Sequence, residues 1–344
     1  MQTSAGGMGG IAPGCSSPAT QVEVPAPGAP PSLTPPAPGA VSHRLLIGGS
    51  LAALYLIWGS TYFAMKVALE TLPPFLMASV RFILAGGLLY GGLRLSGAPN
   101  PTGQQWISAA RTGVLLLACG NGFVAVGQRW VSSGFAAVVV ATMPLWMALI
   151  STFHALRGVP GAQRPSRGEW TGLLVGFAGA ALLQAGGELR AAHPAALVIL
   201  LAPVCWAFGS LQSRTLPMPA GPMANAAQML TGGAVMLVVS FALGEPFPTA
   251  PSTRSLLAVG YLIVFGSIVA FSAYGFLLRH ARPAVATSYA YVNPLVAIVL
   301  GAMLAGELVA TSTWVAAGII LAGVAIVAQA RAAAPASHRA PAQR

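Results

Sequence analysis

The sequence predicts an all-α membrane protein with ten transmembrane helices arranged as two inverted five-helix repeats. Three observations lead to this prediction. Of the 344 residues, 56% are hydrophobic and 7% are charged, and the mean hydropathy is +0.74, whereas soluble domains carry roughly 25% charged residues. The apolar residues form runs that are long enough to cross a bilayer. Finally, residue pairs recur between the two halves at separations of 144 to 150 positions.

Ten stretches reach the length of about 20 apolar residues that a transmembrane helix needs. They are residues 45–66, 74–95, 110–128, 134–154, 169–187, 195–213, 223–243, 256–277, 284–305 and 312–330. Barrel strands would need about ten residues each with strict alternation, and the sequence does not alternate in this way. Helices are therefore the interpretation, and the bilayer acts as the solvent for most of the chain.

Two terminal segments flank the spans. Residues 1–42 are rich in Pro, Gly, Ala and Ser and hold one charge, Glu23. Such a segment buries too little to offset the entropy of ordering, so a disordered tail is expected, and it lacks the basic start and apolar centre of a signal peptide. The spans then divide into a first repeat, 43–190, and a second repeat, 191–331. A short basic tail, 332–344, ends the chain.

The basic residues in the loops predict the orientation of the spans. With the amino terminus in the cytoplasm, twelve arginines fall inside, namely Arg44, Arg94, Arg111, Arg157, Arg164, Arg167, Arg214, Arg279, Arg282, Arg331, Arg339 and Arg344. Four basic residues fall outside, namely Lys66, Arg129, Arg190 and Arg254. Both termini are therefore expected in the cytoplasm, for a multi-pass protein of the inner (plasma) membrane. The preference for arginine, alanine and glycine indicates a GC-rich bacterial genome.

Corresponding residues recur in the two halves of the chain. The pairs are Trp58 with Trp206 and Pro74 with Pro222 at 148 positions, Arg129 with Arg279 and Pro144 with Pro294 at 150, and Trp170 with Trp314 and Gly179 with Gly323 at 144. Because each half has an odd number of spans, the second half enters the membrane in the opposite orientation. Inverted repeats meet at mid-membrane, where rocking can expose one site to each side in turn. The pattern predicts a transporter.

Two predicted spans carry a proline at equivalent positions. Met143 and Pro144 lie in ATMPLWMAL, and Asn293 and Pro294 lie in YVNPLVAIVL. Proline removes a helical hydrogen bond and frees a carbonyl, and irregular backbone at membrane depth is tolerated where it is buried in protein or lines a wet cavity. A simple packing kink is the alternative. The matched pair favours a cavity between the halves, and these four residues are candidates to line it.

Other candidates for the cavity are polar and aromatic residues inside the spans. Arg81 lies about 10 Å into the membrane, where it either acts as an anion contact or gate, bonds helix-end carbonyls as a structural residue, or snorkels to the outer surface. Asn121 either contacts solute or bonds a neighbouring helix. The aromatic candidates are Trp58, Tyr62, Trp146, Trp206, Tyr274, Tyr289 and Tyr291, for which interfacial belts and plain helix packing are the alternatives.

Several of these motifs resemble bacterial drug/metabolite transporters of the EamA type. LYLIWGSTYFAMKVAL and PPFLMASVRFILAGGLLY resemble the first two spans of that family, with Trp-Gly-Ser ending the first span and an arginine seven positions after a proline in the second. ATMPLWMAL and YVNPLVAIVLGAMLAGE resemble the fourth and ninth spans. The resemblance covers about residues 45–331, although the second half reads CWAFGS in place of WGS.

The resemblance implies ten helices in two five-helix repeats with both termini in the cytoplasm. It also implies a central cavity lined mainly by spans one, three, four, six, eight and nine. The solute would be small and polar or amphipathic, such as a metabolite, an amino acid or a drug-like compound, and its transport would be export.

The same residues argue against other classes of protein. The charge of +11 is spread over the ends of apolar runs and forms no cluster that would bind nucleic acid. The chain contains no aspartate, His154 is the only histidine inside a span, and Cys15, Cys119 and Cys205 have no metal or redox spacing. Neither catalytic residues nor a metal or other cofactor are therefore expected. A lipid-handling or scaffold membrane protein without solute transport is the alternative to a transporter.

Energy coupling and assembly are less constrained by the sequence. Proton-coupled carriers usually keep a carboxylate deep in the membrane, whereas the glutamates here lie in the tail, in loops or near span ends. Facilitated export or exchange is therefore expected. Glycine pairs at four-residue spacing, Gly87 with Gly91 and Gly172 with Gly176, allow close helix approach, either within the chain or in a homodimer.

Overall fold

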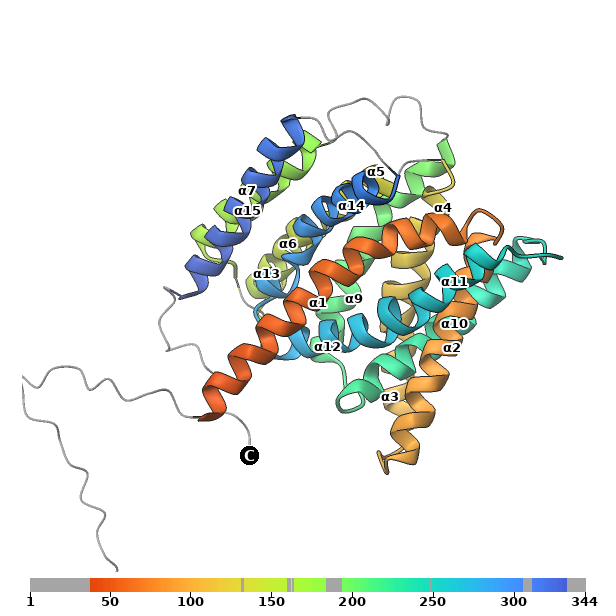
Figure 1. Cartoon of the computed structure of the whole chain (residues 1–344). Helices are drawn as coiled ribbons and strands as arrows, with labels where there is room; N and C mark the ends of the chain where they lie inside the picture. Colours follow the sequence, from red (N-terminus) through yellow and green to blue (C-terminus); the bar gives the residue numbers. More distant parts are fainter. Residues whose placement is uncertain are drawn as a thin grey trace, which may run out of the picture. The chain divides into compact units, whose positions relative to one another are not determined.

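The fold is described by a computed structural model for residues 38–130, 133–159, 162, 164–183, 194–247, 249–305 and 311–332. The chain divides into a short amino-terminal unit, Met1–Ser42, and a body, His43–Arg344, and the account below concerns the body. All regular structure in the described residues is helical (Figure 1), which confirms the predicted class. The predicted tails lie outside the described residues, apart from residue 332 and residues 38–42, which are helical.

The helices of the first half follow the first five predicted spans. They are α1 (Pro38–Ala68), α2 (Pro74–Leu95), the run α3 (Gly103–Gly113), η1 (Val114–Asn121) and α4 (Gly122–Gly127), the pair α5 (Ser133–Val140) and α6 (Met143–Leu156), and α7 (Arg167–Leu183).

The helices of the second half repeat this order. They are η2 (Pro194–Leu201) with α9 (Ala202–Thr215), α10 (Pro222–Ala242), the run α11 (Thr253–Tyr261), η3 (Leu262–Val269) and α12 (Ala270–His280), the pair α13 (Pro283–Ala286) and α14 (Tyr289–Ala305), and α15 (Thr311–Ala332). Among the described residues, six helices are long and apolar enough by themselves to cross a membrane, and Met143–Leu156 and Gly318–Val327 are shorter apolar helices. The ten-span, two-repeat architecture is confirmed.

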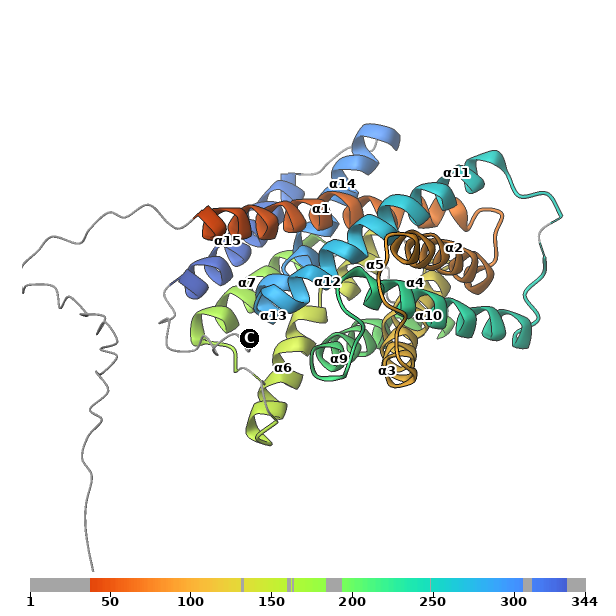
Figure 2. The same cartoon turned by 90° about the horizontal axis from the view of Figure 1, so that it is seen from below.

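Equivalent helices of the two repeats pack against each other. α2 packs on α10, and α7 packs on α15, and Figures 1 and 2 both show α7 and α15 side by side. Glycines allow these approaches: a Cβ on Gly86 would lie 2.9 Å from the backbone nitrogen of Leu230, and a Cβ on Gly323 would lie 2.5 Å from that of Gly176. Partners related by the repeat therefore meet along an axis between the halves.

These contacts distinguish the two glycine pairs seen in the sequence. Gly172 and Gly176 pack within the chain, against Gly323 and Val327 of α15 and the ring of Tyr291. Gly87 and Gly91 of α2, in contrast, have open space where a Cβ would point. The first pair serves the packing of α7 on α15.

The third and eighth spans each contain a π-helical stretch, η1 and η3, at equivalent positions. In the first, the backbone N–H of Gly122 donates to Leu117 O, five residues back, and in the second Ala270 N–H donates to Phe265 O. The two hydrogen bonds lie 148 positions apart in the sequence, which is also the separation of Trp58 and Trp206 in the predicted repeat. π-Helical turns widen a helix and often occur at functional sites, and here both lie in the middle of their spans.

The fourth and ninth spans are each broken by a short turn, between α5 and α6 and between α13 and α14. A hydroxyl caps a carbonyl three residues back in both turns: Thr142 Oγ1 donates to Val139 O at 2.7 Å, and Ser288 Oγ donates to Val285 O at 2.9 Å. Both spans are therefore irregular, as the matched prolines predicted, although the break of the ninth lies close to the start of the predicted span.

The prolines hold different places relative to these breaks. Pro144 lies at the start of α6, where a missing backbone N–H is harmless, whereas Pro294 lies inside α14. Thr142 and Ser288 are 146 positions apart and the prolines 150. The capped turns and the prolines therefore recur at slightly different separations in the two halves.

The amino end of α2 is capped by a side chain from far along the chain. Glu245 follows α10, and its carboxylate accepts the backbone N–H groups of Phe75 at 3.1 Å and Leu76 at 2.8 Å. Ser240 also donates to this carboxylate at 2.8 Å. A carboxylate at a helix amino terminus is favoured by the helix dipole, so Glu245 fastens α10 to α2.

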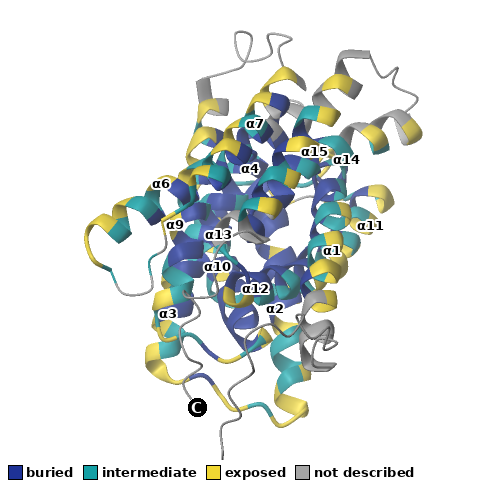
Figure 3. Cartoon of the chain, turned by 90° about the vertical axis from the view of Figure 1, so that its left-hand side faces the viewer, coloured by how far each residue is buried: buried dark blue, intermediate teal, exposed yellow. Residues whose placement is uncertain are grey.

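The core of the body lies between the two halves. Buried residues are concentrated in the middle of the bundle, with exposed residues on its outer faces (Figure 3). The largest fully buried side chains include Phe82, Met143, Met147, Tyr274 and Tyr291. Many exposed side chains are themselves large and apolar, such as Leu84, Leu88 and Phe153, as expected for a surface that faces lipid.

Candidate functional site

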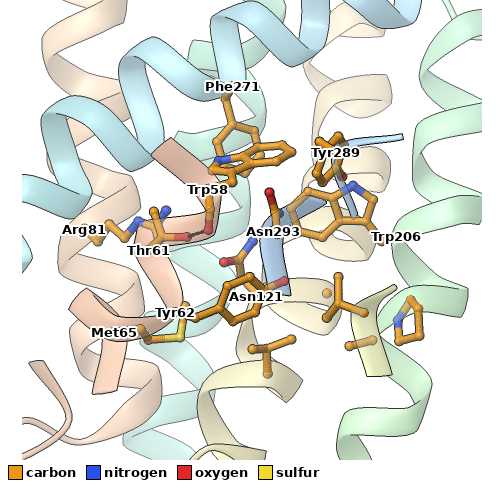
Figure 4. A pocket seen from close by; sticks show the side chains of 15 residues that line it. Trp58, Thr61, Tyr62, Met65, Arg81, Asn121, Trp206, Phe271, Tyr289 and Asn293 are labelled. Atoms are coloured by element: carbon orange, nitrogen blue, oxygen red, sulfur yellow. Dashed lines mark hydrogen bonds between the residues drawn. The ribbon is translucent and has the colours of Figure 1, made fainter. Parts of the chain in front are cut away.

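A cavity with about 520 Å³ of empty space, part of it open to solvent, lies where the two repeats meet. Its described lining is Trp58, Thr61, Tyr62, Met65, Arg81, Gly120, Asn121, Val124, Val140, Ala202, Pro203, Trp206, Phe271, Tyr289 and Asn293 (Figure 4). We call this the central cavity. The first repeat contributes α1, α2, η1, α4 and α5, and the second contributes α9, α12 and α14. The spans that the resemblance implied all take part, together with α2.

Seven of the residues predicted for a cavity line it. They are Trp58, Tyr62, Arg81, Asn121, Trp206, Tyr289 and Asn293.

The other six predicted residues lie elsewhere. Met143 and Pro144 are buried next to the break of the fourth span, and Pro294 is buried inside α14. Tyr291 is buried and donates its hydroxyl to Leu173 O at 3.2 Å. Trp146 is 39% exposed on the outside of α6. The sixth, Tyr274, lines a second cavity described below.

Four aromatic residues surround the ring of Trp58, and we call the five together the aromatic cluster. The ring of Trp58 lies 5.6 Å from that of Trp206, 5.2 Å from those of Phe271 and Tyr274, and 4.7 Å from that of Tyr289. The planes of Trp58 and Trp206 are perpendicular. Edge-to-face contacts of this kind are favourable, so the cluster joins the two repeats at their interface.

Hydrogen bonds fix the polar ends of these rings. Trp58 Nε1 donates to Gly266 O in the π-helical stretch η3 at 3.1 Å. Trp206 Nε1 donates to the hydroxyl of Tyr274 at 3.2 Å, and that hydroxyl also bonds Ser210 Oγ at 2.7 Å. The two tryptophans thus have different partners, although they occupy equivalent places in the repeat.

Each tryptophan also sits against a glycine in the π-helical stretch of the opposite repeat. A Cβ on Gly120 in η1 would lie 2.7 Å from the ring of Trp206, and Trp58 is bonded to Gly266 in η3. A larger residue at Gly120 would push the ring away. The widened helices therefore make room for the tryptophans at the centre of the molecule.

Arg81 lies at the edge of the central cavity and is 2% exposed. Its Nε donates to Ser267 Oγ at 2.8 Å and its Nη2 to Gly266 O at 3.1 Å. The guanidinium also lies 4.6 Å from the ring centre of Phe82. The structural bond to a helix carbonyl that the sequence allowed is therefore present, and the same residue lines the cavity.

Two amide side chains complete the polar part of the central cavity. Asn121 ends η1 and is partly exposed, and Asn293 lies in α14 and is 1% exposed. The Oδ1 of Asn293 has no hydrogen-bond partner among the described residues. Figure 4 shows both amides among the rings of Trp58, Trp206 and Tyr62. A buried acceptor without a donor is costly, so a solute or water would satisfy it.

A second cavity, with about 1070 Å³ of empty space including its open part, lies on the other side of the aromatic cluster. Phe271 lines both cavities, and Tyr274 lines the second. The wall also includes Arg214, Arg279, Asn225, Gln228 and the loop of Leu216, Met218, Pro219, Ala220 and Gly221. We call it the loop cavity. The aromatic cluster separates it from the central cavity.

Sequence reasoning missed several residues of the central cavity. Thr61 and Met65 follow Trp58 at spacings of three and seven and share a helix face with it, so that spacing would have found them. Phe271 and Val140 are ordinary apolar residues of their spans, and nothing in the sequence distinguishes them. Among the described residues, no group of three or more His, Cys, Asp or Glu is placed to hold a metal ion.

The sequence also missed a buried ion pair. Glu169 at the start of α7 is 1% exposed, and its Oε2 lies 2.8 Å from Nη2 of Arg282, just before α13. Ser166 N–H donates to the same carboxylate oxygen at 2.7 Å. Glu169 was expected near a span end, and its burial is produced by the contact between α7 and the segment that precedes α13.

Comparison with known proteins identifies the family. Both halves of the chain match the model of the EamA-like transporter family, at residues 46–184 and 193–329. The chain belongs to the EamA-like transporter family. It is therefore a multi-pass membrane transporter, and the family assignment agrees with the resemblance drawn from the motifs of its spans.

Individual relatives of this EamA-like transporter cover most of its length. The inner membrane transporter YedA of Escherichia coli (strain K12) is 44% identical over 280 residues, which is 81% of this chain and 89% of YedA. A WAT1-related chloroplastic protein of Arabidopsis thaliana is 27% identical over 289 residues, 80% of this chain and 68% of that protein. One crystal structure matches with a TM-score of 0.67 at 21% identity, covering 84% of this chain and 99% of that chain, which shows the shared fold.

Proposed function

We propose that this EamA-like transporter exports a small polar or amphipathic solute across the inner membrane by alternating access between its two repeats. The observation that carries the proposal is the position of the aromatic cluster, which lies between the central cavity and the loop cavity and is built from both repeats. A solute in the central cavity would pass this layer only when the repeats move relative to each other.

The predicted topology assigns sides to the two cavities. The central cavity uses the part of α1 beyond Trp58 and the first turns of α2, which the distribution of arginines assigns to the outer half of the membrane. The loop cavity includes Arg214 and Arg279, which the same rule assigns to the cytoplasm. Export would then run from the loop cavity to the central cavity. The name of YedA, an inner membrane transporter, supports the location in the inner membrane.

The polar groups of the two cavities support facilitated export or exchange. Among the described residues that line them, arginines carry the formal charges, and there is no glutamate. A carrier that moves a proton with its solute usually keeps a carboxylate deep in the membrane. Glu169, which is buried, is paired with Arg282 and belongs to neither lining.

Reconstitution of the purified protein into liposomes tests the proposal. We expect saturable uptake of a solute, and acceleration of that uptake when the same solute is present inside the vesicles, because exchange skips the return of the empty carrier. Candidate solutes would come from comparing the medium of cells that overproduce the protein with that of cells that lack it. A protein that handles lipid or serves as a scaffold would give vesicles as tight as empty liposomes for every candidate.

A further inference from the structure

Two cysteines that are far apart in the sequence meet in the fold. Cys119 lies in η1 of the first repeat, and Cys205 lies in α9 of the second, 86 positions later. Both are free thiols and partly exposed, and their side chains hydrogen-bond each other. Their spacing in the sequence indicates no pair, so the contact is produced by the packing of η1 on α9.

The register of these two helices places the cysteines opposite each other. A Cβ on Gly209 of α9 would lie 2.9 Å from the Cβ of Leu115 in η1. The third and sixth spans run in opposite directions in the ten-span topology. One turn forward from Leu115 and one turn back from Gly209, on the same helix faces, are Cys119 and Cys205. The glycine contact and the hydrogen bond between the thiols therefore describe one register.

The two helices are close enough for a bond between the sulfur atoms. A disulfide needs its two Cβ atoms about 3.5–4.5 Å apart, and the glycine contact one turn away is closer than that. Gly120 follows Cys119 and Trp206 follows Cys205, and a Cβ on Gly120 would lie 2.7 Å from the ring of Trp206. Tight contacts thus lie beside the thiols and one turn away, so a disulfide would require little movement of the backbone.

The depth of the pair decides which reagents can reach it. Cys119 is in the middle of the predicted span 110–128, and Cys205 is in the middle of the predicted span 195–213. Glutathione and thioredoxin keep thiols reduced in the cytosol, but both are polar and do not enter hydrocarbon. Quinones are apolar oxidants that dissolve there. Because both thiols are partly exposed, an oxidant of this class can touch them.

We propose that Cys119 and Cys205 are a modification site, at which a quinone forms a disulfide between the two repeats inside the membrane. Two S–H bonds break and one S–S bond forms, and the quinone takes up two electrons and two protons to become a hydroquinone. A dithiol that reaches the bond reverses the reaction and is itself oxidised to a disulfide. Cysteines that act only as small apolar residues in the packing would not react in this way.

The disulfide would hold the two repeats in one arrangement. Gly120 and Trp206, each next to one of the cysteines, line the central cavity. The bond would therefore tie a wall of the first repeat to a wall of the second. This effect on transport rests on the proposed function, because it assumes that the repeats move, whereas the formation of the disulfide does not depend on it.

Counting thiols on the purified full-length protein in detergent tests the modification site. The oxidant is tetramethylbenzoquinone, whose fully substituted ring forms no stable adduct with thiols, under conditions that oxidise dithiothreitol. The protein is then denatured, its free thiols are labelled with a maleimide, and its peptides are mapped. We expect the free thiols to fall from three per chain to one, with Cys119 and Cys205 in one linked peptide. Three free thiols, or disulfides formed only through Cys15, would overturn the proposal.

Single variants check the identity of the pair. Cys119→Ala and Cys205→Ala each leave one thiol without its partner, so neither variant should lose thiols to the quinone. Cys15→Ser is the matched control, because it removes the cysteine that lies outside the described residues and should leave the reaction of the other two unchanged. Loss of thiols by Cys119→Ala to the same extent as in the wild-type protein would exclude the pair. The wild-type count needs no variant, so it decides even where a variant fails to fold.

Flux in liposomes tests the effect of the bond. We expect oxidised wild-type protein to carry about tenfold less flux than reduced protein, and dithiothreitol should restore it. Cys205→Ala should keep its flux in the presence of the quinone. Full flux through protein that carries the disulfide would overturn the effect on transport. If reduced protein carries no flux of any solute, the proposed function fails, and the thiol count still decides the modification site.

Discussion

Asn293 is a single residue at which burial and polarity conflict. Its amide is 1% exposed and its Oδ1 is without a donor, in a cavity whose other walls are mostly aromatic. An unsatisfied buried polar group costs about 1 to 3 kcal/mol. A protein that keeps such a group accepts the cost in the empty state and recovers it when a ligand supplies the missing donor.

Asn293→Leu should therefore separate stability from activity. The substitution removes the unsatisfied Oδ1 at similar volume but also the hydrogen bond between the amide and the Tyr62 side chain, so we expect the melting temperature in detergent to change little, while flux per folded molecule falls sharply. Thermal unfolding and liposome flux measured on one preparation decide this. A lower melting temperature with full flux per folded molecule would mean that Asn293 bonds a neighbouring helix and does not act in the site.

Glu169 offers a second prediction for a single residue. Its carboxylate is buried against Arg282 at 2.8 Å, and removing one partner of a buried pair leaves a charge uncompensated. Because Arg282 is partly exposed, we expect Glu169→Gln to destabilise the protein by about 2 to 3 kcal/mol, seen as a lower melting temperature.

Glu70→Gln is the matched control for that substitution. Its partner Arg254 lies 3.8 Å away and both side chains are largely exposed. Exposed pairs contribute about 0 to 1 kcal/mol, so the melting temperature should change little. Equal effects of the two substitutions would show that the Glu169 pair is not buried in the detergent-solubilised protein.

Among the elements, the third, fourth, eighth and ninth spans hold irregular backbone that recurs in both repeats, and the sixth span begins with a 3₁₀-helical stretch, η2. η1 and η3 are π-helical, and the breaks before α6 and α14 are capped by Thr142 and Ser288. Each of these four spans contributes at least one residue to the lining of the central cavity, and the eighth also binds Arg81. The straight pairs, α2 with α10 and α7 with α15, flank them and provide a regular frame.

The crossing of α7 and α15 gives a prediction at this scale. A Cβ on Gly323 would lie 2.5 Å from the backbone nitrogen of Gly176, so Gly323→Ala must push the helices apart, at a cost of about 1 to 3 kcal/mol. Gly318, on the same helix, has open space at its Cβ position. Gly318→Ala should therefore be neutral or stabilising by up to about 1 kcal/mol.

Melting temperatures of the two glycine variants, measured side by side in detergent, check this pair. The comparison holds the chemical change and the helix constant, so that only the approach of α7 differs. Equal melting temperatures would contradict the close crossing of the two helices.

The spans themselves could be predicted from sequence because each depends on local hydropathy. α2, for example, occupies the predicted residues 74–95. The π-helical stretches could not, since they depend on a shift of backbone hydrogen bonds within runs such as VLLLACGN that read as ordinary apolar helix. The same holds for residues of the central cavity. Tryptophan, arginine and asparagine stand out in apolar spans, whereas Val140 and Phe271 are selected only by how the helices pack.

For the whole molecule, the two repeats are joined at several levels. Equivalent helices pack on each other, Trp58 and Trp206 touch, and Arg81 of the first repeat bonds Gly266 and Ser267 of the second. These contacts run along the interface from the outer frame to the aromatic cluster. The halves could therefore change their relative orientation only if polar and aromatic contacts at the centre rearrange together.

Topology gives a prediction for the whole chain. The arginine distribution predicts that both termini lie in the cytoplasm and that the segment between α10 and α11 lies outside. Alkaline phosphatase, which is active only outside the cytoplasm, should be inactive when fused after Arg344 and active when fused after Thr249. The reverse pattern of activity in whole cells would invert the orientation, and with it the sides assigned to the two cavities.

The perpendicular contact of Trp58 and Trp206 has a consequence for symmetry. The two residues are exchanged by the repeat, yet a T-shaped pair gives its members unequal roles, and their indole N–H groups bond different partners, Gly266 O and the Tyr274 hydroxyl. The two repeats are therefore not symmetric at the point where their equivalent tryptophans meet. The position equivalent to Tyr274 in the first repeat, 148 residues earlier, is Val126, so an arrangement with the roles of the rings exchanged would lose the hydroxyl partner. The surroundings of the two indoles would therefore change differently when the carrier reverses, and variants that keep one of the two tryptophans should report unequal changes in fluorescence.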